Sequence, residues 1–197
     1  MPISINGSGT ITGIAVGGLP DGCVQVADLA TTGTASSSTF LRGDAAFAEA
    51  GGGKLLKVHY AQTDTSVTIN TPSRADTGLA ITFTPEALGS TFYIHANQFG
   101  LNGVSNDQGV FNLYLMRAIA GGTASQLRVY QYLGNYTTND RAYWGTPLGW
   151  KDTPSYSAGQ TLNYHIECGF YTGNYGLQYK AQEGDLLSTI FVYEVGA

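Results

Sequence analysis

Hydrophobic and polar residues alternate with a period of two along most of the chain after residue 53. In the clearest stretch, Leu162–Phe170, apolar residues and Cys168 occupy one side and Asn, His and Glu the other. Such alternation places successive side chains on opposite faces of a β-strand, and no comparable stretch has the 3.6-residue period of a helix. Further strands are predicted at residues 55–61, 66–70, 79–84, 92–97, 111–116, 127–132, 175–180 and 189–194.

Turn-forming residues separate these short strands, which is typical of an all-β, antiparallel β-sandwich with jelly-roll-like connections. The chain has 27 Gly and 13 Tyr, and only 12% of its residues are charged. This composition suits a compact β protein with many turns. We therefore predict a β-sandwich head domain over residues 54–197, long enough to bury a core of its own.

Several predicted strands are apolar on both faces, most clearly Ile190–Tyr193, with Tyr114 and Met116 adding to the pattern. A lone antiparallel sandwich exposes one face of each sheet to water, so the second apolar face needs a cover. Identical copies around an axis supply such a cover. The alternative is that tyrosine rings, which are amphipathic, remain at the surface.

Residues 1–53 have a different character, because single aliphatic residues are separated by Gly, Ser, Thr and Asn. These aliphatics are too few for an independent core, and two strands alone are marginal in water. The triple glycine Gly51–Gly53 predicts a flexible joint. We predict an extended attachment or stalk segment, with a disordered linker as the alternative. The residues expected to carry the attachment are Ile3, Ile5, Ile11, Ile14, Leu19, Pro20, Phe40 and Leu41.

Three shorter patterns in this segment predict local structure. Gly17–Gly22 contains a Pro and a Gly at the spacing of a β-turn. Val24–Thr31 is compatible with a short helix. Arg42–Asp44 is the Arg-Gly-Asp tripeptide that integrins read in other proteins, but we interpret it as a Gly-centred turn whose two charged residues can pair.

Four groups of residues, in matching order, resemble segments of tailed-bacteriophage virion fibre proteins. Ala45–Phe47 departs from this family, which typically has Gly-Thr-Trp there, so the local turn is expected to differ. The similar segments are Ile5–Gly13 with Gly17–Gly22 (the opening), Ser38–Asp44 (Ser-Thr-Phe-Leu-Arg-Gly-Asp), and Lys54–Val58 and Ser188–Val195 (the first and last strands of the head).

The resemblance implies a homotrimeric structural fibre of a phage virion, made in the host cytoplasm and located on the tail or the capsid surface. Residues 1–53 would bind other virion proteins, and the head would recognise a glycan or protein on the host surface during adsorption. A capsid head fibre or decoration protein is the first alternative. A polysaccharide depolymerase is the second, although fibre-like enzymes of that kind carry a long β-helix. We therefore expect no enzymatic activity.

Aromatic residues are concentrated in Gly134–Ser157, which includes both tryptophans of the chain. Exposed aromatics in loops stack on sugar rings or protein surfaces, and short polar side chains add hydrogen bonds. The alternative is that the rings fold inward and plug the end of the sandwich. A second, weaker candidate loop is Phe99–Gly109. The predicted receptor-binding residues are Tyr136, Asn139, Arg141, Tyr143, Trp144, Trp150, Lys151 and Tyr156.

Charge and motif content exclude several other classes. The net charge is −5 and the Lys and Arg residues form no cluster, which argues against nucleic acid as a partner. No apolar run approaches the ~18 residues of a membrane-spanning helix, and residues 1–5 do not resemble a secretory signal. Neither a phosphate-binding loop nor a nucleophile motif is present, so we predict no cofactor and no catalytic residues.

The histidines and cysteines show no metal-ligand spacing, so we predict no metal site. We interpret His59, His95 and His165 as structural strand residues on the same face as polar neighbours. His165 and Glu167 share a strand face and are expected to pair. Cys168 shares a face with apolar residues and is expected to act as a small buried hydrophobe.

Overall fold

The computed structural model describes residues 4–5, 11–12, 31–37, 39–49, 54–70, 73–102, 109–135, 142–170 and 178–196. Contacts divide the chain into two compact units, Met1–Gly52 and Gly53–Ala197. Within the described residues, all regular secondary structure is β. The predicted roles of residues 1–53 as a stalk and of residues 54–197 as a head remain predictions.

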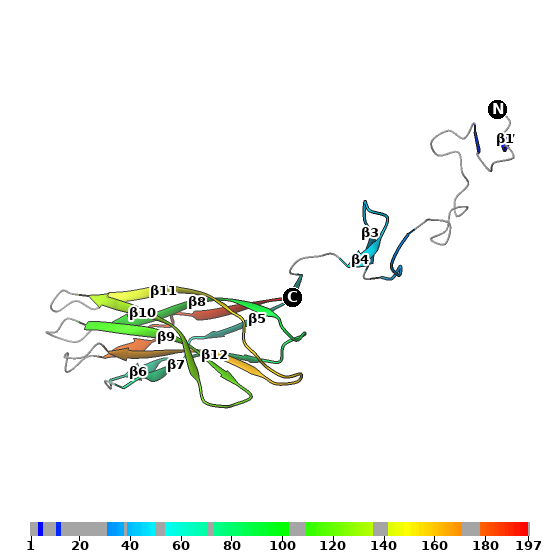
Figure 1. The fold of residues 1–197 in the computed structure, drawn as a ribbon. Helices are drawn as coiled ribbons and strands as arrows, with labels where there is room; N and C mark the ends of the chain where they lie inside the picture. Colours follow the sequence, from blue (N-terminus) through cyan, green and yellow to red (C-terminus); the bar gives the residue numbers. More distant parts are fainter. Residues whose placement is uncertain are drawn as a thin grey trace. The chain divides into compact units, whose positions relative to one another are not determined.

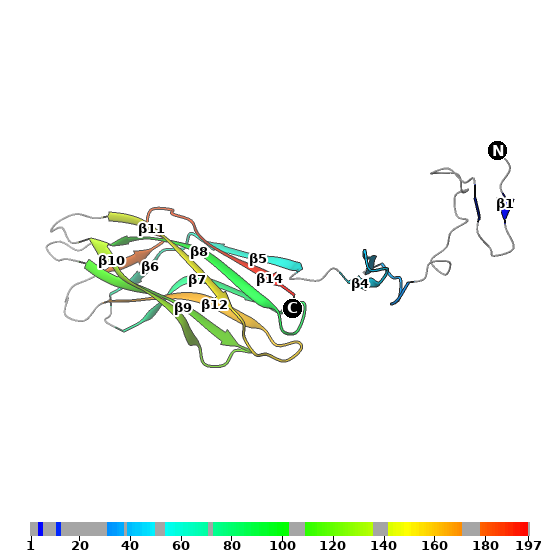
Figure 2. The ribbon, with the colours of Figure 1, turned by 45° about the horizontal axis from the view of Figure 1, so that its top comes forward.

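The second unit is a sandwich of two antiparallel sheets (Figures 1 and 2). The smaller sheet has the order β10-β9-β12-β7. In the larger sheet, the long strand β8 pairs with β11 on one side and with β14 and β13 on the other, and these pair with β5 and β6. The strands are β5 Leu55–Thr63, β6 Val67–Ile69, β7 Ala75–Phe83, β8 Thr91–Asn102, β9 Gly109–Ile119, β10 Ser125–Asn135, β11 Ala142–Asp152, β12 Leu162–Phe170, β13 Tyr179–Ala181 and β14 Ser188–Val195.

This architecture confirms the predicted all-β antiparallel sandwich. Burial alternates along β12 and β14 as the sequence pattern predicts. The core lies between the sheets, and its largest fully buried rings are Tyr164, Tyr179, Phe92 and Phe111. Of the strand predicted at residues 175–180, the structure has β13 at Tyr179–Ala181, while residues 171–177 lie outside the described residues.

The interpretation of Gly134–Ser157 as a loop is wrong for β11, because this segment is an eleven-residue strand. Gly145, Pro147 and Gly149 hide the strand in the sequence, since both residue types are depleted in strand interiors. Proline is tolerated at the edge of a sheet, where no neighbouring strand requires its missing N–H. In the described part of the chain, β11 pairs with β8 alone.

A fully buried carboxylate, Glu194, fixes the loop between β7 and β8. Its Oε1 accepts hydrogen bonds from the backbone N–H groups of Glu86 (2.8 Å) and Ala87 (3.2 Å) and from the Ser90 hydroxyl (2.9 Å). Its Oε2 lies 3.1 Å from His59 Nε2. Hydrogen bonds of this kind compensate a buried carboxylate for its lost hydration.

The prediction that His59 is a structural strand residue with a polar neighbour on its face is confirmed, and that neighbour is Glu194. His59 points inward, is 8% exposed, and stacks on Phe83 with ring centroids 3.8 Å apart. Its polar partner, Glu194, is distant in sequence but occupies the adjacent strand β14. Alternation along β5 alone does not reveal this pairing.

A second buried network joins the two sheets. Arg117 of β9 donates to both carboxylate oxygens of Asp152 on β11, at 2.8 and 2.9 Å. The Tyr164 hydroxyl of β12 donates to the same carboxylate at 2.9 Å. Burial, and then the negative charge of Asp152, raise the pKa of Tyr164 well above its usual value, so Tyr164 stays a donor.

In the first unit, two short hairpins are described. β1 (Ser4–Ile5) pairs with β2 (Ile11–Thr12), and β3 (Thr39–Leu41) pairs with β4 (Phe47–Glu49). Phe40 and Leu41 are exposed by 63% and 49%. Ile5 and Ile11 are described in their backbone only. Ile3, Ile14, Leu19, Pro20, the predicted turn at Gly17–Gly22 and residues 24–30 of the predicted helix lie outside the described residues.

The prediction of a turn at Arg42–Asp44 is confirmed. Ala45 N donates to Arg42 O at 3.0 Å, and the side chains of Arg42 and Asp44 approach to 3.8 Å. Ala45 has a φ of 58°, a left-handed conformation that favours glycine. The turn therefore places a non-glycine residue in a conformation that glycine adopts more easily.

Candidate binding surface

The outer face of the larger sheet is aromatic and largely apolar. Cross-strand pairing places Val58, Tyr193 and Tyr93 side by side on β5, β14 and β8. The next row toward the opposite end of the sheet holds Tyr60, Phe191 and His95. The outward positions of these strands and β11 are Leu55, Val58, Tyr60, Gln62, Thr189, Phe191, Tyr193, Val195, Thr91, Tyr93, His95, Asn97, Phe99, Gly145, Pro147, Gly149 and Lys151.

These side chains remain substantially exposed. Leu55, Val58, Tyr60 and Tyr93 are exposed by 54%, 45%, 48% and 40%. Lys151 is the only charged residue among the outward positions named above, and its Nζ lies 5.9 Å from the Tyr93 ring centroid. The prediction that β14 is apolar on both faces is therefore confirmed, and the described residues of the second unit leave its outer side uncovered.

Ring contacts organise the outer face into a continuous surface. The ring centroids of Tyr60 and Phe191 are 4.6 Å apart, and those of Phe191 and Tyr193 are 6.5 Å apart. His95 meets Tyr193 edge-on at 5.8 Å. Offset and edge-to-face packing of this kind is favourable and restricts the orientation of each ring.

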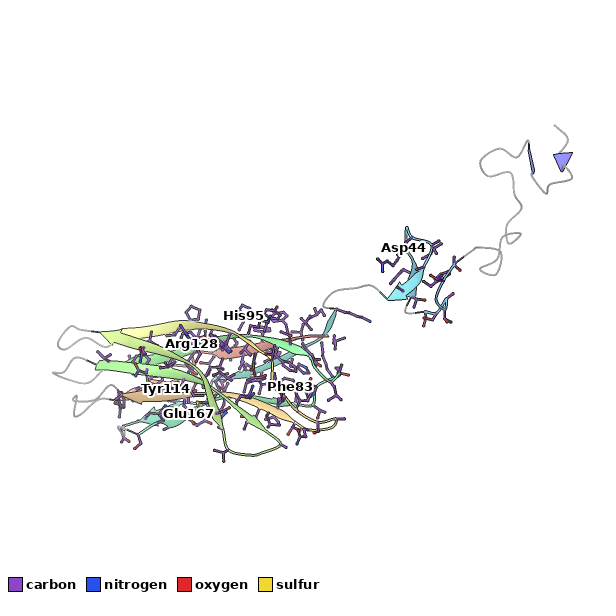
Figure 3. All side chains as sticks on the ribbon, in the orientation of Figure 1. Asp44, Phe83, His95, Tyr114, Arg128 and Glu167 are labelled. Atoms are coloured by element: carbon purple, nitrogen blue, oxygen red, sulfur yellow. The ribbon has the colours of Figure 1, made fainter. Side chains whose placement is uncertain are left out.

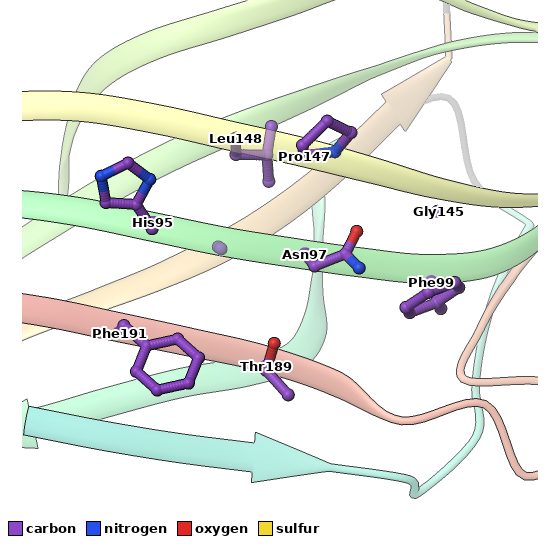
Figure 4. A pocket seen from close by; sticks show the side chains of 9 residues that line it. His95, Asn97, Phe99, Gly145, Pro147, Leu148, Thr189 and Phe191 are labelled. Carbon is purple, nitrogen blue, oxygen red and sulfur yellow. The ribbon is translucent and has the colours of Figure 1, made fainter.

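A hollow of about 640 Å³ lies between β11, β8 and β14 on this face (Figure 4). We call it the groove and define it by His95, Asn97, Phe99, Pro147, Thr189 and Phe191. Its volume falls in the range of roughly 300–1,000 Å³ that is usual for ligand sites. Apolar rings and a few uncharged polar groups line it.

Glycine shapes one wall of the groove. A Cβ atom at Gly145 would lie 2.6 Å from the Phe99 ring, closer than real contacts allow. Gly145 therefore permits the ring to lie directly against β11. The backbone N–H of Phe99 donates to Ser188 Oγ at 2.9 Å, which anchors the same residue from the inner side.

The floor of the groove carries an uncompensated polar atom. Asn97 lies between Thr189 of β14 and Pro147 of β11. Its Oδ1 is buried and has no hydrogen-bond partner among the described residues. A buried acceptor without a partner costs free energy, on the order of 1–3 kcal/mol. Because this oxygen has almost no exposed surface, the cost belongs to the fold itself.

The predicted receptor-binding residues do not form one cluster. Tyr143 of β11 pairs with Leu101, whereas Trp150 pairs with Ile94, so the two lie about 23 Å apart along the strand. The side chains of Tyr143 and Trp144 lie outside the described residues, as do Tyr136, Asn139 and Arg141 entirely. Their recognition role remains a prediction.

Trp150 closes the edge of the sandwich. It is 36% exposed and shares the inward side of β11 with the buried residue Leu148. The Arg128 guanidinium of β10 lies 5.5 Å from its ring centroid. Beside it, the Tyr130 hydroxyl donates to the Gly149 carbonyl at 2.7 Å. Trp150 is thus closer to the alternative interpretation, a ring turned toward the sandwich, than to an exposed loop aromatic.

The remaining predicted recognition residues have different surroundings. Lys151 is exposed on the outer face. The Tyr156 hydroxyl donates to the Ala87 carbonyl at 2.5 Å and accepts from Ser90 N at 3.3 Å. Tyr156 therefore holds the loop between β7 and β8 in place and is only partly available for an external contact.

Tyr114 and Met116, predicted to add to an uncovered apolar face, are covered by this chain itself. The Arg74 guanidinium lies 4.0 Å from the Tyr114 ring centroid, and Arg74 Nη1 lies 4.0 Å from Met116 Sδ. Both residues lie on the outer face of the smaller sheet. Figure 3 shows Tyr114 and Glu167 on the other sheet from His95, with Phe83 in the interior.

Several other titratable side chains of the second unit are paired or buried. His165 Nε2 lies 3.5 Å from Glu167 Oε1, in agreement with the predicted pairing. Cys168 is fully buried as predicted, and burial raises the pKa of its thiol well above the usual value. At the start of the head, a hydrogen bond between Lys57 and Glu86 lowers the pKa of the Glu86 carboxyl and raises the pKa of Lys57.

No group of three or more His, Cys, Asp and Glu residues with metal-site geometry occurs in the described part of the chain. A search of the same residues finds no helix of sufficient length and hydrophobicity to span a bilayer.

Comparison with known proteins finds only weak structural similarity. No protein-family model matches the chain, and no curated protein matches it. A structure of the Gt strain of infectious bursal disease virus aligns with a TM-score of 0.35 and 10% identity, covering 76% of this chain and 38% of the other. The VP2 subviral particle of the same virus aligns with a TM-score of 0.35 and 9% identity, covering 76% and 34%. The chain thus spans well under half of the length of these viral chains, and similarity this weak assigns no function.

Proposed function

We propose that this chain is a structural fibre protein of a tailed-phage virion whose head adsorbs to the host surface. The observation that carries the proposal is the exposed, aromatic, nearly uncharged outer face of the larger sheet. Soluble domains rarely leave a large apolar patch in water unless it contacts another molecule. The ordered resemblance of four separate segments, which lie between residues 5 and 22, at 38–44, at 54–58 and at 188–195, to phage fibres agrees with this function.

Residues 1–53 attach the protein to the particle or to a neighbouring virion protein, and copies associate as a homotrimer. The part of the outer face closest to Leu55 suits contact between copies. We call it the base patch and define it by Leu55, Val58, Tyr93 and Tyr193. Leu55 follows the Gly51–Gly53 joint closely in sequence, so copies held together through their leading segments bring their base patches together. Aromatic side chains are enriched in the centres of such interfaces.

Association of copies strengthens a weak host contact. When several heads on one fibre engage one cell, each later contact forms at a high effective concentration. Individually weak binding of a surface glycan or protein therefore suffices for adsorption.

A capsid head fibre or decoration protein is the alternative location for the same fold and the same face. The proposal assigns no catalytic step to the chain. Incubation of the protein with host surface polysaccharide tests this directly, and shortened polysaccharide chains would contradict it.

Adsorption and location are measured together. Purified full-length protein, added to host cells before the phage, is expected to bind the cells and slow phage adsorption. Gold-labelled antibody against the head is expected to mark the tail. Label on the capsid shell, with no protein bound to cells and unchanged adsorption, would contradict the fibre assignment and favour the decoration protein.

A further inference from the structure

The groove differs from the base patch in ways that indicate a different occupant. The base patch is built from side chains that are half exposed and almost wholly apolar. The groove is concave and places an amide and a hydroxyl between two phenyl rings, with the His95 imidazole beside Phe191. Flat apolar surfaces suit proteins, whereas a hollow with a few placed polar groups suits a small ligand.

The charge of the groove limits the ligand. Among the residues that the structure describes, no Asp, Glu, Lys or Arg lines it, and Lys151 lies outside it, beside Tyr93. An ionised ligand would lose hydration without gaining an opposite charge. The ligand is therefore uncharged.

The two rings and the amide require a ligand with an apolar face and a polar edge. The rings of Phe191 and Phe99 flank the groove from β14 and β8 (Figure 4). A pyranose ring offers C–H groups on its face, which pack against an aromatic ring, and hydroxyl groups around its edge. The Asn97 amide and the Thr189 hydroxyl lie side by side on neighbouring strands, and a ligand hydroxyl, which both donates and accepts, pairs with groups of both kinds.

We infer that the groove binds one unit of a neutral saccharide, with its C–H face on Phe191 or Phe99 and its hydroxyl edge on Asn97 and Thr189. This inference rests on the proposed adsorption function and names the ligand class and its site. It moves the glycan contact from the predicted aromatic segment to the outer face of β8, β11 and β14.

The test uses full-length protein on an array of neutral and acidic oligosaccharides, followed by titration of the best neutral ligand. At least one neutral oligosaccharide is expected to bind. Asn97→Ala and Phe191→Ala are each expected to weaken binding about tenfold or more, since a lost hydrogen bond or ring contact in a site has that effect. Gly145→Ala is expected to weaken it as well, because the new Cβ displaces the Phe99 ring.

Leu88→Ala is the matched control, since it removes an exposed apolar side chain from the loop between β7 and β8, outside the groove, and is expected to leave binding unchanged. Circular dichroism and mass photometry of each variant establish that fold and assembly are intact. Gly145→Ala changes the groove without removing any polar group. Ligand binding and circular dichroism of this variant, compared with each other, therefore distinguish an effect of groove shape from a loss of stability.

Four results would overturn the inference. Two of them are that no neutral oligosaccharide on the array binds, or that binding is unchanged in all three groove variants. The other two are that only acidic saccharides bind and Lys151→Ala abolishes this binding, or that Phe191→Ala lowers the mass of the oligomer. The last result would place a second copy in the groove. If Asn97→Ala and Phe191→Ala leave adsorption unchanged, the groove is not the binding site, but the proposed function stands. If the protein without substitutions does not slow phage adsorption, the proposed function itself is contradicted.

Discussion

The outer faces of the two sheets show how one sandwich treats apolar side chains in opposite ways. On the smaller sheet, Arg74 covers Tyr114 and Met116, and the adjacent strand β12 presents His165 and Glu167. On the larger sheet, the aromatic side chains of β5, β14 and β8 have no comparable charged cover among the described residues. Both faces contain apolar residues, but only one of them leaves those residues exposed.

This difference shows that an apolar residue on the second face of a strand does not by itself indicate a contact with another molecule. Tyr114 and Met116 satisfy the same sequence criterion as Phe191 and Tyr193. The deciding property is whether a long charged side chain from the same chain lies over them. A guanidinium packs well on an aromatic ring and keeps its own contact with water, so it serves as that cover.

The largest expected effect is a difference in stability between substitutions on the inner and the outer side of the larger sheet. Ile190 is fully buried, so Ile190→Ala is expected to lower the free energy of unfolding by about 2–5 kcal/mol. Tyr60 lies on the outer side, and Tyr60→Ala is expected to cost less than about 1.5 kcal/mol, the range of an aromatic pair contact. Urea unfolding followed by tryptophan fluorescence measures both values.

Equal destabilisation by these two substitutions would mean that the outer rings support the fold as much as the core does. In that case their exposure would carry no information about a partner. A parallel measurement at several protein concentrations separates folding from association, because only association depends on concentration.

A charge on each outer face tests which face contacts other copies. Val58→Asp is expected to raise the concentration at which the oligomer dissociates by about a hundredfold, since an unpaired charge in an interface is strongly unfavourable. Ala80 is exposed on the outer side of β7, so Ala80→Asp is the matched control and is expected to leave the mass distribution unchanged. Mass photometry over a dilution series gives both results. Dissociation caused by Ala80→Asp alone would assign the interface to the smaller sheet.

The smallest expected effect concerns the charged cover itself. Arg74→Ala is expected to lower the free energy of unfolding by about 0.5–2 kcal/mol and to increase binding of an apolar fluorescent dye, because Tyr114 becomes exposed. Lys151 lies farther from its ring, at 5.9 Å, so Lys151→Ala is expected to change stability by less than about 0.5 kcal/mol. A larger effect of Lys151→Ala would show that the aromatic face also depends on a charged cover.

Alternation predicted much of the sandwich because many strands keep one face on the core. Along Leu162–Cys168 the pattern and the burial agree position by position, whereas at the end of the strand Gly169 is buried and Phe170 is half-buried. The pattern fails on β10, where register shifts between Gln126 and Arg128 and between Tyr130 and Leu133 interrupt the period of two. Tyr130 consequently turns inward with Leu127, although the two residues differ in parity.

The groove was not predictable from the sequence, since its residues come from three strands that are far apart in the chain. Asn97, Pro147 and Thr189 become neighbours only through sheet pairing. The aromatic content of Gly134–Ser157 predicted a recognition site that includes the tryptophans, whereas Phe99 and Phe191 line the concave part of the surface. The clearest signal available was Gly145, since a glycine inside a strand often marks close packing against its backbone.

The pairing of β14 with both β5 and β8 has a consequence for biogenesis. The opening strand of the head finds its partner only after residues 188–195 have left the ribosome, so the larger sheet closes late. Such long-range pairing slows folding and makes it depend on a finished polypeptide. A chain that ends before residue 188 lacks β14, the strand that joins β5 to β8, so its larger sheet stays incomplete.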